Sequence, residues 1–106
     1  MLNGTQFNDA VANVTFNVDM HTEDNNGQMC YEIKPYQIPF RAMTPKGYNG
    51  IVVAGRCISG THEAMASYRV TGNCCQMGEN AGKVISYAVK NNINVRDVEV
   101  NEIVVL

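Results

Sequence analysis

Two short segments carry residues whose type and spacing suit a dinucleotide ligand. The first is the apolar run 51–54, which ends at Gly55 and Arg56. A strand ending in glycine lets a ligand approach the backbone, and open α/β sheets bind ligands beyond the carboxyl ends of their strands. The second is Asn73–Cys75, where we expect a helix to begin, because free N–H groups at a helix N-terminus attract negative charge. Together they predict half of a dinucleotide site. The other half, a Gly-x-Gly-x-x-Gly turn, is not in the sequence.

Four cysteines, Cys30, Cys57, Cys74 and Cys75, are the other candidates for chemistry. No pair has Cys-x-x-Cys spacing, and neither histidine lies at metal-ligand spacing from them, so we predict no metal site. Adjacent cysteines rarely form a disulfide, because the bond would be strained. We interpret all four as buried, reduced thiols in a reducing compartment. A thiol-redox protein using the adjacent pair at a helix N-terminus is an alternative, since that position stabilises a thiolate.

Hydrophobic spacing predicts the strands that must position these residues. Alternation over residues 14–20 predicts a half-buried strand. Alternation over residues 36–42 is accompanied by Pro35 and Pro39, which cannot donate to a ladder, so it predicts an edge strand or an extended arm. The run 51–54 is apolar on both faces and predicts an interior strand of a parallel sheet.

The clearest predicted element is a helix from about Asn73 to about Lys90, and with the strands it makes the chain α+β. Its apolar pairs recur three or four residues apart. This spacing places Gly78 and Gly82 on the buried face and Asn80 on the polar one. Glycine costs about 1 kcal/mol relative to alanine inside a helix, so we expect these two glycines to allow close packing against another element. A more specific interpretation is that this other element carries or covers a cofactor.

The end of the chain is less well defined by its pattern. Residues 95–100 are ambiguous between a strand and a short helix, and the final run Ile103–Leu106 is entirely apolar. Natural termini usually fray into solvent. We therefore expect this run to be covered by a neighbour or folded into the sheet, or to mark a cut inside a longer structure.

Bulk properties exclude several classes of function. The 106 residues suit one domain, 1–106, with a net charge of −2. Its basic residues are scattered, which argues against nucleic acid and anionic membranes as partners. No apolar run is long enough to span a bilayer, and no signal peptide opens the chain. The cytoplasm is favoured, with a signal peptide further upstream left open.

An ordered set of motifs is more informative than any single one. The motifs are Tyr36-x-Ile38-Pro39-Phe40-Arg41-Ala42, Pro45-Lys46-Gly47, Ile51-Val52-Val53-Ala54-Gly55-Arg56-x-Ile58-Ser59, Thr61-His62-Glu63-Ala64, Ser67, Arg69-Val70 and Gly78-x-x-Ala81-Gly82. This set resembles the C-terminal end of a bacterial FAD-dependent oxidoreductase family. More distantly, it is similar to the flavoprotein subunits of succinate dehydrogenase and fumarate reductase. The resemblance runs from about Thr5 to about Val100.

The resemblance implies FAD as the cofactor of a longer parent protein. The run 51–54 would be the last strand of a Rossmann-like sheet, and the later helix would aim its N-terminus at the pyrimidine edge of the flavin. The cofactor-binding residues implied are Ala54, Gly55, Arg56, Gly72, Asn73, Cys74 and Cys75. Distant relatives carry an acid after the glycine to accept from the ribityl hydroxyls, whereas Arg56 has no acceptor and could pair with the pyrophosphate instead.

The resemblance also implies substrate-facing groups. His62 and Arg69 align with the segment that faces substrate in dicarboxylate-using relatives, and Arg41 is a third catalytic candidate. Arginine binds carboxylates with a rigid fork, and histidine relays protons near neutral pH. The structural alternatives are that Arg69 ties down a loop, that His62 is a satisfied interior residue and that Arg41 only anchors the arm.

Two hypotheses of different class follow. The leading one is a fragment of an FAD-dependent oxidoreductase, inactive alone because an N-terminal FAD-binding segment is missing. The alternative is a self-contained interaction or oligomerisation module. In either case we expect the isolated chain to purify without FAD and to form a homodimer through exposed strand edges and apolar surface. In the parent, the partner would be a small-molecule substrate.

Overall fold

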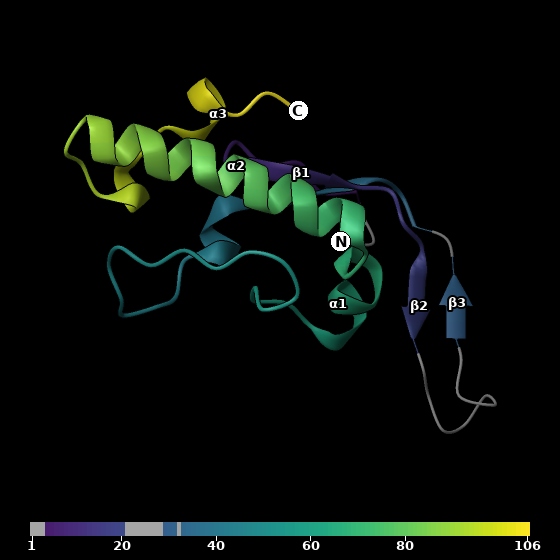
Figure 1. Cartoon of the computed structure of the whole chain (residues 1–106). Coiled ribbons are helices and arrows are strands. Elements are labelled where there is room, and N and C mark those ends of the chain that lie inside the picture. The colour runs from purple at the N-terminus through teal and green to yellow at the C-terminus, as the bar shows by residue number, and fades with distance from the viewer. Residues whose placement is uncertain (1–3, 21–28, 32) are drawn as a thin grey trace.

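The computed structural model describes residues 4–20, 29–31 and 33–106. Its order of elements is β1 (Ala10–Val14), β2 (Val18–Met20), β3 (Met29–Tyr31), β4 (Tyr36–Pro39), a 3-10 helix (Phe40–Met43), α1 (His62–Tyr68), α2 (Thr71–Lys90), a second 3-10 helix (Val95–Asp97) and α3 (Val100–Ile103). The mixed α+β class predicted from the sequence is confirmed (Figure 1).

The strands form two antiparallel pairs. β1 pairs with β4, so that Val14 lies opposite Tyr36, with an irregularity near Ala10. β2 pairs with β3 to continue the ribbon beyond the body of the molecule (Figure 1). The predicted strand over 14–20 is therefore broken at residues 15–17, and the predicted strand over 36–42 turns into a 3-10 helix after Pro39.

Both edges of the β1–β4 pair are covered by other parts of the chain. On α2, the Asn80 side chain donates to the Val11 carbonyl at 2.7 Å, and Gln76 Oε1 accepts from the Asn13 N–H at 2.9 Å. Beside β4, the Gln37 N–H donates to the Thr5 carbonyl at 3.1 Å. Edge pairing between copies was one reason to expect a homodimer; α2 and the segment around Thr5 contact these two edges, and the homodimer itself stays a prediction.

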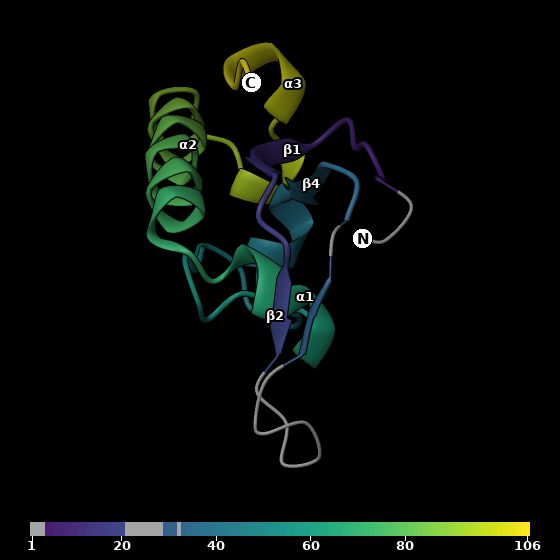
Figure 2. The same ribbon diagram turned by 90° about the vertical axis from the view of Figure 1, so that its right-hand side faces the viewer.

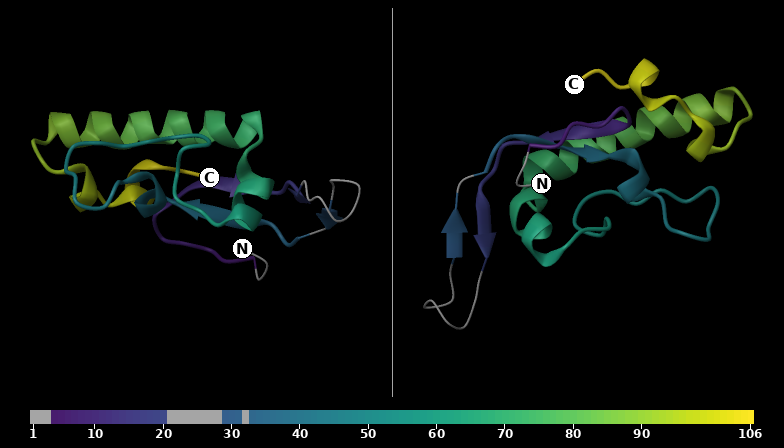
Figure 3. Two further views of the ribbon diagram at one scale, coloured as in Figure 1. Left: turned by 90° about the horizontal axis from the view of Figure 1, so that it is seen from below. Right: turned by 180° about the vertical axis from the view of Figure 1, so that it is seen from behind.

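α2 spans 20 residues and packs along β1, as Figure 3 shows. It begins two residues before the predicted start and ends at the predicted Lys90. The predicted faces were partly wrong, because Gly78 and Gly82 are exposed with open space around them, whereas Asn80 is buried. The buried positions are Asn73, Met77, Asn80, Ala81, Val84 and Ala88. The helix therefore rests on β1 through its larger apolar residues and two asparagines, and its glycines face solvent.

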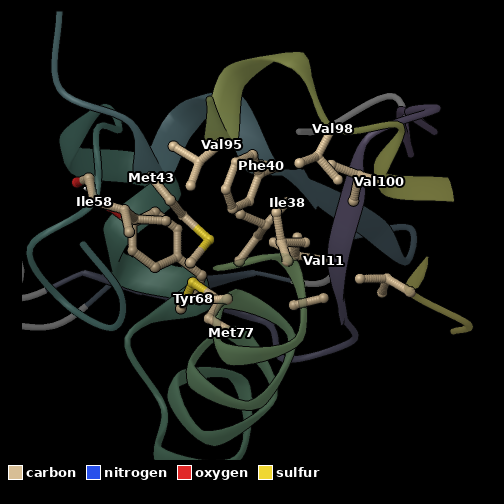
Figure 4. Close-up of a cluster of buried hydrophobic side chains, with 14 of the residues drawn as sticks. Val11, Ile38, Phe40, Met43, Ile58, Tyr68, Met77, Val95, Val98 and Val100 are labelled. Atoms are coloured by element: carbon tan, nitrogen blue, oxygen red, sulfur yellow. Dashed lines mark hydrogen bonds between the residues drawn. The ribbon is translucent and has the colours of Figure 1, made fainter. Parts of the chain in front are cut away.

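The hydrophobic core lies between α2, the β1–β4 pair and the C-terminal segment (Figure 4). Met43, Met77, Val11, Val14 and Val84 are among its fully buried side chains. In Figure 2, α2 stands beside the strands, α3 lies at the top of the view, and α1 lies lower down, beside β2. α1 contacts β2, and the Ser67 hydroxyl donates to the Phe16 carbonyl at 2.6 Å.

The run Ile51–Ala54 is not a strand, contrary to the prediction. It lies in a loop without regular structure, bracketed by Gly50 and Gly55, which both have positive φ. Its Val53 N–H donates to the Met43 carbonyl at 2.8 Å, and Val52 to Ala54 are half-buried against the core. Among the described residues there is no parallel strand beside it. An apolar β-branched run thus packs on the core without forming a ladder.

The C-terminal segment is helical where its pattern was ambiguous. Residues 95–97 and 100–103 form the second 3-10 helix and α3. Val104 is buried, but Val105 and Leu106 are exposed, so the expectation that the last four residues are covered is met by Val104, and by Ile103 in part.

Candidate functional site

The N-terminus of α2 is left without a side-chain cap. Val70 occupies the cap position, no side chain bonds there, and the first turn contains no acidic residue. The Cys74 N–H is bonded within the helix, to the Val70 carbonyl at 3.2 Å. The N–H groups of the three residues before it have no partner within the helix, since an α-helix always leaves its first donors unpaired. This end of α2 therefore offers donors and a positive dipole to an anionic or carbonyl-rich ligand.

Asn73 adds a buried donor to this terminus. The residue is 9 % exposed, and its side-chain Nδ2 is buried with no hydrogen-bond partner among the described residues. A buried amide group without a partner costs about 1–3 kcal/mol, and most such groups in proteins are paired. The Asn73 amide is therefore an unsatisfied buried donor beside the unpaired N–H groups at the start of α2.

The predicted Gly55 junction lies directly against this terminus. Gly55 has φ +87°, and a Cβ added there would meet Cys74 Sγ at 3.8 Å. Arg56 follows, and its Nε donates to the Arg69 carbonyl at 3.1 Å. Two segments separated by almost 20 residues are thus brought together, as the sequence predicted, although the first segment is a loop.

The remaining predicted cofactor residues differ in exposure. Ala54 is half-buried, and its carbonyl accepts from Cys57 Sγ at 3.2 Å. Gly72 is exposed, with nothing within 4 Å of an added Cβ. Cys74 is half-buried, whereas Cys57 and Cys75 are exposed and free, which corrects the prediction that all cysteines are buried. Cys30 lies outside the side chains that the structure describes.

The three predicted catalytic residues do not converge. His62 is exposed at the first position of α1, so it is not the interior histidine of the structural alternative either. Arg69 is the residue at which α1 ends, seven residues further on. Arg41 pairs instead with Asp9, with Nη1 2.6 Å from Oδ1, and its guanidinium lies 4.8 Å from the Phe7 ring centre.

The structure also contains an apolar hollow of about 160 Å³. No pattern in the sequence predicted it. It is lined by Phe7, Tyr36, Gln37, Ile38, Pro39, Ala42, Ile58, Ser59, Gly60, Ala64 and Tyr68. The Tyr68 hydroxyl donates to the Ile58 carbonyl at 3.3 Å and would lie 2.6 Å from a Cβ on Gly60. A side chain at position 60 would therefore force Tyr68 to shift.

The two tyrosines of the hollow are both held neutral. Burial raises the pKa of Tyr68, and the nearby thiols of Cys57 and Cys74 raise it further. Burial also raises the pKa of Tyr36, which the neighbouring Ser67 lowers in part. The Tyr36 hydroxyl is buried and has no hydrogen-bond partner among the described residues.

Two kinds of feature are absent from the part of the chain that the structure describes. Among the described residues, no group of three or more His, Cys, Asp or Glu side chains is arranged to hold a metal ion. Within the same part of the chain, no helix has both the length and the apolar character needed to cross a membrane.

The fold and the site together define a small α+β chain with an open, donor-rich helix terminus beside a left-handed glycine. A family model described as FAD dependent oxidoreductase matches residues 1–105. The chain therefore belongs to the FAD-dependent oxidoreductase family, as the motifs indicated. No significant match was found among curated proteins or among solved structures.

Proposed function

We propose that this chain forms the ribityl and isoalloxazine side of the flavin site in an FAD-dependent oxidoreductase. An N-terminal segment would supply the glycine-rich turn and complete a Rossmann-like fold, of a type similar to the bacterial relatives and to succinate dehydrogenase and fumarate reductase flavoproteins. The family match supports the oxidoreductase class. The single observation that carries the assignment of the site is the unpartnered Asn73 amide at the uncapped start of α2.

The described residues fit a flavin at this point. The free N–H groups of α2 and the Asn73 amide are donors suited to the carbonyl-rich pyrimidine edge of the ring, where negative charge develops on reduction. Gly55 allows backbone approach on one side, and Gly72 leaves the other side open. Arg56 would face the pyrophosphate. The flavin itself would supply the electron-accepting chemistry, and this chain would position it and stabilise its charge.

The proposal also assigns two residues of this chain to the substrate. His62 and Arg69 lie at opposite ends of α1, on the order of 10 Å apart along a helix of this length. They would reach a small substrate from two sides, Arg69 as an anion ligand and His62 as a proton carrier. Without the dinucleotide turn, the chain alone would neither hold FAD tightly nor turn over a substrate.

Flavin fluorescence quenching tests the proposal. Titrating riboflavin with the chain should give weak, saturable quenching, with a Kd on the order of 1 mM, because only half of the site is present. Asn73→Ala should abolish it, and Asn91→Ala, an exposed asparagine at the other end of α2, should not. Tight FAD binding by the chain alone would contradict the missing half, and equal quenching by both variants would contradict the site.

A second candidate function, an interaction module, is favoured by one surface. The exposed stripe on α2 consists of Thr71, Cys75, Gly78, Gly82, Ile85 and Val89. These positions are spaced four and three residues apart, so they share one face of the helix, with open space at both glycines. Small residues let a second helix approach closely, and we propose a homodimer in which two α2 stripes meet across a two-fold axis.

Light scattering distinguishes this candidate. The double variant Ile85→Gln with Val89→Gln should turn the dimer into a monomer. The matched variant Lys83→Gln with Lys90→Gln, which alters neighbouring exposed positions off the stripe, should leave it intact. A monomeric wild-type chain at high concentration would rule out the homodimer.

A further inference from the structure

A second hollow lies on a part of the surface that the proposed flavin site does not use. Its volume is about 190 Å³. It is lined by Asp9, Phe40, Arg41, Thr44, Arg96, Val98 and Val100, and is called the Arg41–Arg96 hollow below. None of the residues assigned to the flavin lines it. Its volume equals the share of about six water molecules in the liquid, which suits a small organic molecule.

Arg96 is held in place by the loop above it. Its Nη2 donates to the Tyr48 carbonyl at 2.9 Å and also to the Pro45 carbonyl. Two bonds from one nitrogen fix the plane of the guanidinium. The described residues show no partner for its other nitrogens, so the rest of the fork stays available for a ligand. An arginine fixed in this way loses little side-chain entropy on binding.

Arg41 is held from the opposite wall. Its backbone N–H donates to Asp9 Oδ2 at 3.2 Å and its Nη1 donates to Oδ1 at 2.6 Å, while Phe7 stacks on the guanidinium. Asp9 neutralises one of the two arginines, which leaves a net positive charge at the rim. An incoming anion therefore faces one free cation and one cation that it must share with Asp9.

The floor of the hollow is apolar. Phe40, Val98 and Val100 are each less than 9 % exposed and lie on the same side of the core (Figure 4). Such a floor is unsuited to a fully hydrated inorganic ion, and it suits a short carbon skeleton. The planar fork of arginine matches the two oxygens of a carboxylate.

We infer that the Arg41–Arg96 hollow binds a small carboxylate with a short apolar body. Its carboxylate lies between the two guanidinium groups and its carbon atoms lie on Phe40, Val98 and Val100. The inference goes beyond the proposed flavin site and does not depend on it, because no residue is shared.

The chain as it stands allows a direct test by NMR titration at constant ionic strength, with butyrate as the probe and inorganic phosphate as the comparison. Butyrate should shift the amides of residues 40–44 and 96–100. Arg41→Gln and Arg96→Gln should each weaken binding at least tenfold, and Lys90→Gln, which removes an exposed charge elsewhere, should not. Phosphate binding as tightly as butyrate would overturn the role of the apolar floor, and unchanged affinity in both arginine variants would overturn the site.

The Asp9→Asn variant is expected to bind butyrate more tightly, a result that misfolding would not produce. The substitution removes the carboxylate that competes for Arg41, so butyrate affinity should rise several-fold. Lower affinity in a folded Asp9→Asn protein would show that Asp9 positions Arg41 rather than competing with the ligand, and would overturn the competition. The rise remains measurable even if Arg96→Gln loosens the loop that its bonds hold.

Discussion

Two asparagines on the buried face of α2 have opposite surroundings. In the middle of the helix, Asn80 is 3 % exposed, and its amide donates to the Val11 carbonyl at 2.7 Å. Two turns earlier, Asn73 is 9 % exposed, and its amide has no partner among the described residues. Because buried amides are normally paired, the two regions differ in kind: the amide in the middle of the helix is satisfied and the one at its start is not.

The two longer helices repeat the contrast at their N-termini. α1 is capped by Thr61, whose hydroxyl accepts from the Ala64 N–H at 3.1 Å, and Glu63 lies in its first turn. α2 has neither a capping side chain nor an acid there. Stability alone would favour a cap of about 1 kcal/mol at both. The absence of one at α2 leaves its first N–H groups and the positive end of its dipole uncompensated, which is the feature that the proposed flavin site uses.

The largest expected effect is on the paired asparagine. Asn80→Ala should lower the free energy of unfolding by about 2 kcal/mol, because it leaves the buried Val11 carbonyl without its donor. Asn73→Ala should not lower it and should raise it by up to about 1 kcal/mol, because the substitution removes a buried amide that has no partner. Urea denaturation of both variants measures the difference. Equal losses would mean that Asn73 is paired in solution, and would contradict the difference between the two asparagines.

The next largest effect on stability is expected at two glycines, where substitution by alanine acts in opposite directions. Gly55→Ala should destabilise the chain by about 1–2 kcal/mol, because φ is +87° and alanine is strained there. Gly82→Ala should stabilise it by about 1 kcal/mol, because this exposed helix position has room for a Cβ. Thermal denaturation should move the two melting temperatures in opposite directions. A loss of stability in Gly82→Ala would point to a partner on the stripe.

The smallest effect is a pH dependence from Tyr36 and Tyr68. Burial raises the pKa of both phenols above the usual 10.0, so the unfolded chain loses these protons first as the pH rises. Stability should be constant in this respect below about pH 10 and fall as the pH rises through the folded pKa values.

Each phenylalanine variant should flatten that fall. At neutral pH, Tyr68→Phe should cost about 1 kcal/mol by losing the bond to the Ile58 carbonyl, and Tyr36→Phe should be neutral. Urea unfolding at pH 8 and pH 10.5 checks both, with Tyr48→Phe at an exposed position as the control. A steeper fall in either variant would contradict the burial of its phenol.

The sequence predicted the extent of α2 well and its orientation poorly. Periodicity treats glycine as apolar, but a residue without a side chain buries little, so Gly78 and Gly82 were placed inside when they face solvent. Asn80 was placed outside because its type is polar, although its amide finds a carbonyl on β1 69 residues away. The run 51–54 resembled a strand because β-branched spacing says nothing about which neighbour is present.

The candidate site could also be predicted only in part. Gly55 and the start of α2 could each be singled out from the sequence, because both follow from local rules for glycine and for helix termini. The burial of the Asn73 side chain could not, and neither could the pairing of Arg41 with Asp9, which are 32 residues apart. Such contacts depend on how the elements pack, and one sequence gives no measure of that packing.

The most direct test of the central claim, that the start of α2 is a ligand site and its middle is scaffold, is an amide NMR map of the chain titrated with riboflavin. We expect shifts concentrated at residues 55–56 and 72–75, with the amides of Val11 and Asn80 unmoved. Shifts confined to the middle of α2, or no shift at residues 72–75 at saturating riboflavin, would contradict it.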